Sequence, residues 1–462
     1  MERFVNRLTD KWKNLSDLQK YVVTGLMGAS GVTALQYTAG FLQSILFGRV
    51  LGADGYGILA NALHWLVFLG MPVGAVFRNL LVRRWPLASE RERELLSGWT
   101  LKMGFVLSVI VATGFIIIIH IFPIFKDESV ARGVKLAMIG FVFYALLQAI
   151  SALFTAEKKP AVAILFTRAW LTIVLFIVGA TYFFVTKVRN PYHYVYFSIG
   201  VNIIGVIVGI LWLRWRRPNL IRISNVLESP LFMERLRTIL RFAAITFLTN
   251  SSFTLPPILL GLLSNATELG VFHIALRFIG PVVVLNILML NILMPVVSEL
   301  YHNREYERLL KVVYKILMAV SGFSLLMGIV VAVVLYIILP ELKDPAYGKS
   351  FPVFLMMVIA VILNIAAGNT NMFLNIAHKE RYVLIAQGIA ILVQTIVALL
   401  VIPIYGAIGA AFTFLVGPPL SKWIGYWMVR RKLGLKISLF DALWWYFSTK
   451  SRKSSRKMKD VG

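Results

Sequence analysis

Long runs of apolar residues constrain the fold of this chain more than any other feature. Hydrophobic residues make up 59% of its 462 residues, against roughly 45–50% in soluble domains. They gather in runs of about 20 residues or more, each long enough to cross a hydrocarbon core of about 30 Å as a helix. We therefore predict an all-α polytopic membrane protein with twelve transmembrane helices, at residues 21–47, 56–81, 99–122, 134–156, 162–185, 192–213, 239–263, 270–297, 312–339, 352–377, 382–402 and 407–429.

The charged residues between these runs predict the orientation. Most Lys and Arg residues fall in the N-terminal segment, in every second connection and in the C-terminal tail, whereas the alternate connections hold few. The positive-inside rule then places both termini in the cytoplasm, which requires an even number of spans. The net charge of +26 is thereby explained by topology in the plasma (inner) membrane, and we expect no nucleic-acid partner.

The same pattern divides the chain into five parts. Residues 1–20 place Phe4, Leu8, Trp12 and Leu15 at helical spacing among basic residues, as in an amphipathic cytoplasmic helix. Residues 21–213 form a first lobe, 214–238 a basic cytoplasmic linker, 239–429 a second lobe and 430–462 a polybasic cytoplasmic tail suited to anionic membrane lipids. Solvated termini that merely obey the positive-inside rule are the alternative for both ends.

An internal repeat relates the two lobes. One constant offset places residues of the first and second spans on residues of the seventh and eighth: Gly48 on Gly261, Ala53 on Ala266, Gly57 on Gly270 and Ala62 on Ala275. Two six-helix bundles in the same orientation indicate a parallel repeat about an axis along the membrane normal. Transporters built in this way bind substrate between the repeats, near the middle of the bilayer.

Residues 48–57, Gly-Arg-Val-Leu-Gly-Ala-Asp-Gly-Tyr-Gly, resemble the signature that follows the first helix in Wzx-type polysaccharide flippases. These belong to the multidrug/oligosaccharidyl-lipid/polysaccharide (MOP) exporter superfamily. The resemblance covers essentially the whole chain, although the signature does not name a substrate. It implies two pseudo-symmetric, MATE-like bundles in a V, alternating access, and a cavity lined by the first, second, seventh and eighth helices. Peptidoglycan-precursor flippases of this superfamily usually have two further spans.

The predicted spans contain no Asp or Glu, which argues against proton relays and cation sites. Arg277 lies about 10 Å inside the eighth span, and under the repeat offset it falls on His64. Arginine can bind phosphate through two parallel hydrogen bonds, so we predict that Arg277 and His64 hold an anionic group such as a lipid pyrophosphate. A structural or snorkelling Arg277, and a core His64 bonded to a carbonyl, are the alternatives.

Six further residues are candidates for the same site. Three are cations, Arg49, Arg78 and Lys422. They could bind the same anion, and the alternative is that they snorkel to lipid head groups. Polar side chains that suit sugar hydroxyls, or that bond between helices, are Gln36, Tyr37 and Asn250.

These features favour a flippase for an anionic lipid-linked oligosaccharide over an enzyme. The runner-up is a cation-coupled small-molecule (multidrug) exporter, which the absence of intramembrane carboxylates disfavours. A membrane glycosyltransferase or polymerase would need catalytic acids or a large outer connection. The chain has no cysteine, no metal-ligand spacing of histidines and no Walker A motif, so we expect no metal, no cofactor and no ATP hydrolysis.

Overall fold

The computed structural model describes residues 17–216, 247–248 and 251–448. Within these ranges every regular element is a helix and there is no strand, as predicted. Residues 1–16 of the predicted amphipathic segment 1–20, and the basic run 450–459, lie outside the described residues. The chain forms two compact units, which are considered separately: unit 1 holds residues 1–46, 65–123 and 132–246, and unit 2 holds residues 47–64, 124–131 and 247–462.

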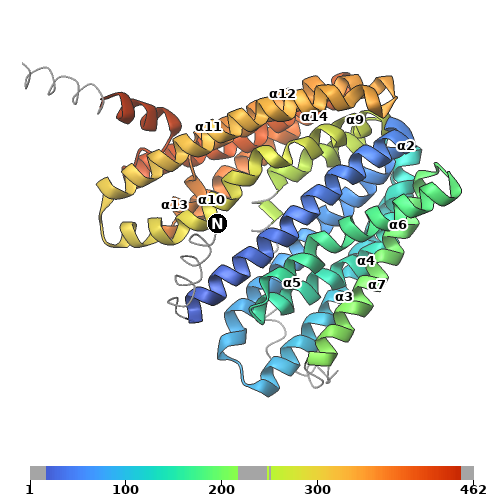
Figure 1. The fold of residues 1–462 in the computed structure, drawn as a ribbon, viewed down its shortest axis with the longest axis horizontal. Coiled ribbons are helices and arrows are strands. Elements are labelled where there is room, and N and C mark those ends of the chain that lie inside the picture. Colours follow the sequence, from blue (N-terminus) through green and yellow to red (C-terminus); the bar gives the residue numbers. More distant parts are fainter. Residues whose placement is uncertain (1–16, 217–246, 249–250, 449–462) are drawn as a thin grey trace, which may run out of the picture. The chain divides into compact units, whose positions relative to one another are not determined.

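Within each described range, the helices follow one another with short connections (Figure 1). The first half contains α2 (Asp17–Arg84), η1 (Trp85–Leu87), α3 (Glu90–Ile121), α4 (Glu128–Ala156), α5 (Pro160–Ile164), η2 (Leu165–Ala169), α6 (Trp170–Thr186) and α7 (Pro191–Arg216). A helix at Ser251–Leu263 follows. The second half continues with α9 (Ala266–Phe278), α10 (Gly280–His302), α11 (Tyr306–Ile338), η5 (Leu339–Leu342), η6 (Pro345–Lys349), α12 (Ser350–Ala366), α13 (Thr370–Ile376) and α14 (Glu380–Leu433). A last helix covers residues 439–448.

Two of these helices are broken at a single glycine. Helix α2 has 68 residues, and a straight helix of that length would extend about 100 Å, roughly three hydrocarbon cores. Gly52 (φ 71°) is non-helical inside α2, and Gly406 (φ 54°) is non-helical inside α14. Glycine adopts positive φ without a steric penalty, so one residue is enough to end one helical segment and begin the next. The sequence predicted connections at both places.

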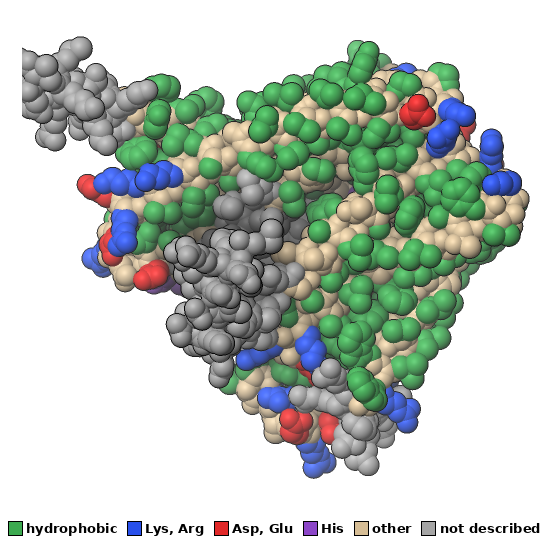
Figure 2. Space-filling model, viewed as in Figure 1, with side chains coloured by type: hydrophobic (Ala, Val, Ile, Leu, Met, Phe, Trp, Pro, Cys, Tyr) green, Lys and Arg blue, Asp and Glu red, His purple; other side chains and the backbone are tan. Residues whose placement is uncertain are grey.

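Seven described helices are long and apolar enough to cross a membrane, or eight if α5 and α6 form one bent span. Two of the seven are α2 and α14, which the glycines divide. On the face in Figure 2, hydrophobic side chains cover the flanks of the helices, while Lys, Arg, Asp and Glu gather at their ends. The chain is therefore a multi-pass membrane protein, and the number of twelve spans stays a prediction.

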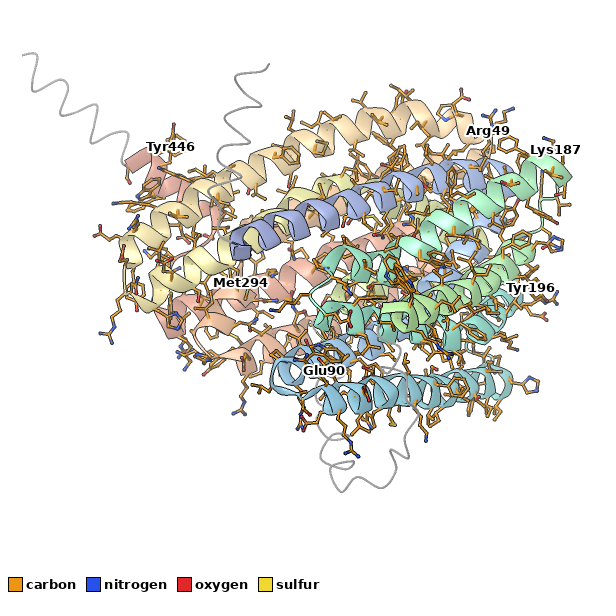
Figure 3. The ribbon with its side chains drawn as sticks, turned by 60° about the horizontal axis from the view of Figure 1, so that its bottom comes forward. Arg49, Glu90, Lys187, Tyr196, Met294 and Tyr446 are labelled. Carbon is orange, nitrogen blue, oxygen red and sulfur yellow. The ribbon has the colours of Figure 1, made fainter. Side chains whose placement is uncertain are left out.

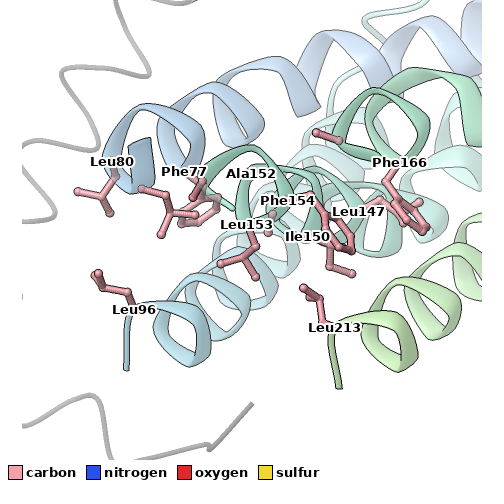
Figure 4. Packing of buried hydrophobic residues seen from close by; sticks show 14 of the residues in the cluster. Phe77, Leu80, Leu96, Leu147, Ile150, Ala152, Leu153, Phe154, Phe166 and Leu213 are labelled. Carbon is pink, nitrogen blue, oxygen red and sulfur yellow. The ribbon is translucent and has the colours of Figure 1, made fainter. Parts of the chain in front are cut away.

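Unit 1 packs around a buried aromatic and aliphatic cluster (Figure 4). Phe77, Phe154 and Phe166 are almost completely buried in it. Beside this cluster the predicted fifth span is bent by 51°, because residues Leu165–Ala169 form a π-helical turn. Such a turn inserts an extra residue into the helical ladder. The indole Nε1 of Trp170 donates to the Val201 carbonyl at 2.8 Å and fixes the helix after the bend.

Candidate substrate-binding site

Two histidines and an arginine meet inside unit 2. His64 lies in the second segment of α2, while His273 and Arg277 are four residues apart on α9 and share one face. The imidazole centroids of His64 and His273 are 5.6 Å apart, and Arg277 interacts electrostatically with both rings. Arg277 lies about 16 Å along α9 from Ala266, one residue before the helix ends.

The hydrogen bonds of this cluster leave donors and acceptors available. His64 Nε2 donates to the Thr254 carbonyl at 3.1 Å, so its Nδ1 remains an acceptor. The buried Nε2 of His273 has no hydrogen-bond partner among the described residues. Arg277 is exposed, and no described carboxylate forms an ion pair with it. A guanidinium with five N–H donors beside two imidazoles can bind an oxyanion.

No contact among the described residues of unit 2 joins Arg49 or Lys422 to this cluster. Arg49 lies near the end of the first α2 segment and is 4.0 Å from Glu341 Oε2, with both side chains exposed. Figure 3 shows Arg49 at the opposite end of unit 2 from Tyr446. Lys422 is half-buried on α14, and its ammonium has no described hydrogen-bond or ion-pair partner. Arg78 is exposed and belongs to unit 1.

None of the predicted sugar-binding residues lies among the described residues of unit 2. Gln36 is half-buried and Tyr37 is exposed, both in unit 1, and Asn250 lies outside the described residues. The alternative for His64, a histidine bonded to a carbonyl, agrees with its bond to Thr254. Among the predicted site residues that are described in unit 2, the structure brings together His64 and Arg277.

Two residues of the cluster were missed by the sequence analysis. His273 could have been found from its four-residue spacing to Arg277. Asn61 lies one turn before His64 and packs against Gly261; both polar atoms of its amide are buried without a partner among the described residues. The repeat argument gave no sign of these residues, because His273 falls on Ala60 and Asn61 falls on Ile274.

A second arrangement lies at the other end of the same helices, and we call it the carboxylate end: Asp127, Glu268 and Asp344. Each of these side chains accepts a backbone N–H at the first turn of a helical segment distant in sequence. Asp344 accepts from Ala53 at 2.7 Å, Asp127 from Ala266 at 2.9 Å and Glu268 from Ala407 at 2.8 Å. Hydrogen bonds and a favourable helix dipole therefore hold these segment starts together.

The surroundings of Asp127 favour the ionised form of its carboxylate. Partial burial disfavours its charged form, but hydrogen bonds from Ser129 and from the backbone of Ala266 outweigh that effect and lower the pKa of Asp127 below its ordinary value. Asp127 thus stays ionised, and stays an acceptor, in moderately acidic solution.

Reciprocal contacts join the two repeats at the carboxylate end. A Cβ atom on Gly57 would overlap the Ala266 carbonyl, and one on Gly270 would overlap the Ala53 carbonyl. Under the repeat offset Gly57 corresponds to Gly270 and Ala53 to Ala266, so each contact is the counterpart of the other. We call this pair of contacts the glycine crossing. Small residues four apart allow helix backbones to approach this closely.

Comparison with protein families identifies one match. The model for "Polysaccharide biosynthesis protein" matches residues 23–301, which is more than half of the chain. No match was found among curated proteins.

Several solved structures of other proteins share the fold of this chain. An inward-facing multidrug resistance MATE family transporter of the MOP superfamily matches with a TM-score of 0.69 at 16% identity, over 88% of this chain and 98% of that one. The lipid II flippase MurJ in an inward closed conformation matches with a TM-score of 0.66 at 14% identity, over 91% of each chain. A MOP superfamily transporter from Pyrococcus furiosus, described as having a binding pocket of reverse polarity, matches with a TM-score of 0.54 at 16% identity, over 90% of this chain and 95% of that one. The chain has the MOP-superfamily fold and belongs to the polysaccharide biosynthesis protein family.

Proposed function

We propose that this protein is a flippase that moves an anionic lipid-linked oligosaccharide across the plasma membrane for surface polysaccharide biosynthesis. The family description supports the polysaccharide connection, and the shared fold with a lipid II flippase supports a lipid-linked cargo. The distribution of basic residues supports cytoplasmic termini.

The observation that carries the proposal is the lack of a described carboxylate partner for Arg277. A guanidinium at membrane depth is costly unless it has a partner or water. Arg277 is exposed, has no described carboxylate partner and lies beside His64 and His273. A diphosphate between lipid and sugar supplies the missing negative charge and enough acceptor atoms for a bidentate contact.

Alternating access requires a barrier that opens on one side at a time. We assign the outer barrier to the carboxylate end and the glycine crossing, because these contacts join segments from both halves of the sequence. Every bond in this set can break without leaving a charge in hydrocarbon, since the acids lie in connections or first turns at the end of the helices. The cargo would then leave past the separated starts of α9 and the second α2 segment.

A cation-coupled multidrug exporter is the second candidate, because the MATE transporter shares the fold. Such a mechanism favours a carboxylate in the membrane interior. The described acids near the cluster's helices are at helix starts and connections, as Glu268 is in the first turn of α9. The cationic cluster therefore favours the anionic cargo.

A flipping assay in proteoliposomes tests the proposal. A fluorescent oligosaccharide linked through pyrophosphate to a polyprenol is placed in the bilayer, and the appearance of its sugar on the opposite face is followed. We expect Arg277→Gln to slow flipping at least ten-fold, because charge-assisted hydrogen bonds contribute about 1.5–3 kcal/mol each. Arg277→Glu should abolish flipping, and Arg277→Lys should be intermediate because it keeps the charge without the bidentate geometry.

Arg308→Gln is the matched control, because Arg308 is an exposed arginine paired with Glu305 away from the cluster. It should flip the substrate at the wild-type rate. Normal flipping by Arg277→Glu at a normal protein level would defeat the role of Arg277. Transport of cationic compounds by a wild-type protein that fails to move pyrophosphate-linked sugars would favour the second candidate.

A further inference from the structure

The last described helix, residues 439–448, is fixed firmly against unit 2. Helix α14 ends at Gly434, which has positive φ, and Leu435, Ile437 and Ala442 are buried beneath the segment that follows. Ser438 and Asp441 cap the new helix reciprocally: the Ser438 N–H donates to Asp441 Oδ2 at 3.0 Å, and the Asp441 N–H donates to Ser438 Oγ at 3.2 Å.

The outer face of this helix is apolar and exposed. Four of its large exposed residues lie at i, i+3, i+4 and i+7, namely Phe440, Leu443, Trp444 and Phe447, and Tyr446 is exposed as well. A helix of about ten residues is too short to cross a bilayer, and aromatic residues on one face are typical of a helix in the interface. The following residues 449–462 hold six Lys and Arg residues and one Asp, which suits a negatively charged surface.

A cavity of about 560 Å³ lies where this helix meets the start of α11. Tyr314 forms one wall: its hydroxyl donates to the Lys436 carbonyl at 2.7 Å, and its ring is 5.7 Å from that of Trp445. The residues that line the cavity are Glu307, Leu310, Lys311, Tyr314, Lys436, Asp441, Trp444 and Trp445.

The charges in this cavity leave two cations for a ligand. Asp441 Oδ2 already accepts from the Ser438 backbone and hydroxyl and from the Tyr426 hydroxyl at 2.7 Å. Lys436 is exposed, and its ammonium has no hydrogen-bond or ion-pair partner among the described residues. Lys311 is 3.8 Å from Glu307, but both side chains are more than half exposed, and exposed pairs of this kind contribute little.

The depth of the cavity matches a head group. Lys311 lies about 8 Å along α11 from Tyr306, just before the apolar part of that helix begins. Polar head groups occupy roughly the outer 5–7 Å of each side of a bilayer. A bilayer whose hydrocarbon core begins at the apolar part of α11 would therefore place Lys311 near the level of its phosphates.

We propose that this cavity binds the phosphate of a membrane phospholipid that remains with the protein and is not its cargo. Lys311 and Lys436 donate to the phosphate oxygens, and Trp444 and Trp445 cover the glycerol. An anionic phospholipid and a zwitterionic one both supply this phosphate. The site is separate from the Arg277 cluster and does not depend on the proposed cargo.

Native mass spectrometry of the delipidated full-length protein tests the site with three added lipids: phosphatidylglycerol, phosphatidylcholine and diacylglycerol. We expect at least one tight lipid per protein with either phospholipid and none with diacylglycerol, which lacks the phosphate. Equal affinity for the two phospholipids identifies the phosphate alone as the ligand, and preference for phosphatidylglycerol identifies net negative charge as a further requirement.

The double variant Lys311→Gln/Lys436→Gln should bind the phospholipid on the order of ten-fold more weakly for each lysine removed. The matched control is Lys315→Gln/Lys432→Gln, which removes two exposed lysines of the same end outside the cavity. Its affinity should stay within about two-fold of wild type. Thermal unfolding of all three proteins checks their folding. Equal affinity of the double variant and wild type, or tight binding of diacylglycerol, would overturn the proposal.

Discussion

Removing the carboxylates of Asp127 and Asp344, the two members of the carboxylate end that lie in connections, should shift the protein towards an outward-open state. Asp127 and Asp344 each accept the N–H of the first residue of a helical segment, Ala266 and Ala53. We expect the double variant Asp127→Ala/Asp344→Ala to fold and to open more often at this end. Besides the bonds to Ala266 and Ala53, which join segments from the two halves of the sequence, the variant loses the local bonds of Asp127 to Ser129 and of Asp344 to Ala346. Each local bond lies within one half, so the shift is worked from the bonds to Ala266 and Ala53 alone.

The size of the shift follows from the energy of a helix cap. Replacing a capping carboxylate by alanine costs about 1 kcal/mol, with a range of about 0.5–2 kcal/mol. Two caps give about 2 kcal/mol, and because 1.4 kcal/mol is a factor of ten in an equilibrium constant, the ratio of open to closed protein should rise about 30-fold. Asparagine keeps an acceptor and loses only the charge, which contributes about 0.3–1 kcal/mol near a helix start. The double asparagine variant should therefore shift the ratio by only a few-fold.

Thiol labelling measures this ratio without background, because the chain contains no cysteine. Ser264 is 7% exposed and lies between two contacts of the connection 122–127: Lys126 N–H with the Leu262 carbonyl, and Asp127 with Ala266. A cysteine at Ser264 should react with an impermeant maleimide only when that connection moves away. When opening is fast relative to labelling, the rate is proportional to the open fraction.

The control is Glu341→Ala, because Glu341 is an exposed acid near the same end that forms only a long ion pair with Arg49. Its labelling rate should stay within about two-fold of the parent. The reasoning fails if the double alanine variant labels at the parent rate, or if Glu341→Ala accelerates labelling as much as the double variant does.

Three further predictions concern neighbouring features. Gly57→Ala and Gly270→Ala should each raise the labelling rate about ten-fold, because the new Cβ meets backbone atoms that no rotamer change can move; Gly114→Ala, where a Cβ meets nothing within 4 Å, should not raise it. His273→Leu should raise the midpoint of thermal unfolding by about 2 °C, because it removes a buried nitrogen that has no hydrogen-bond partner among the described residues. The same variant should flip the substrate more slowly if the imidazole contacts the cargo. An unchanged flipping rate would make His273 purely structural. Because the folded pKa of Asp127 is lowered, its stabilising contribution is complete above its ordinary pKa of about 3.9 and is lost as the pH falls through the lower folded value. Spin-label distances across the carboxylate end should therefore lengthen below about pH 4 in the parent and be insensitive to that range in Asp127→Asn.

Hydropathy predicted the membrane helices well, because a bilayer accepts few backbone structures other than apolar helices. The breaks at Gly52 and Gly406 could also be placed from sequence, since each falls between two apolar runs. The bend at Leu165–Ala169 could not, because this turn contains neither glycine nor proline. The helix 439–448 was missed because a search for runs of about 20 residues overlooks a short interfacial helix.

The candidate site was predicted only in part, because a single sequence says little about contacts between distant residues. The pairing of His64 with Arg277 followed from the internal repeat, which carries information on distant contacts. The bonds of Asp127 and Asp344 join residues 139 and 291 positions apart, and no pattern in one sequence specifies such partners. His273 was overlooked because the repeat comparison assigns it an alanine as counterpart.

The glycine crossing has a consequence for the ancestry of the chain. Its two contacts are made by the same motif, an alanine followed four residues later by a glycine, which appears once at Ala53 and Gly57 and again at Ala266 and Gly270. A surface of this kind is self-complementary, as in an isologous dimer. Two separate copies of a half-length polypeptide could close the same interface, so gene duplication and fusion would preserve a contact that an ancestral homodimer already possessed.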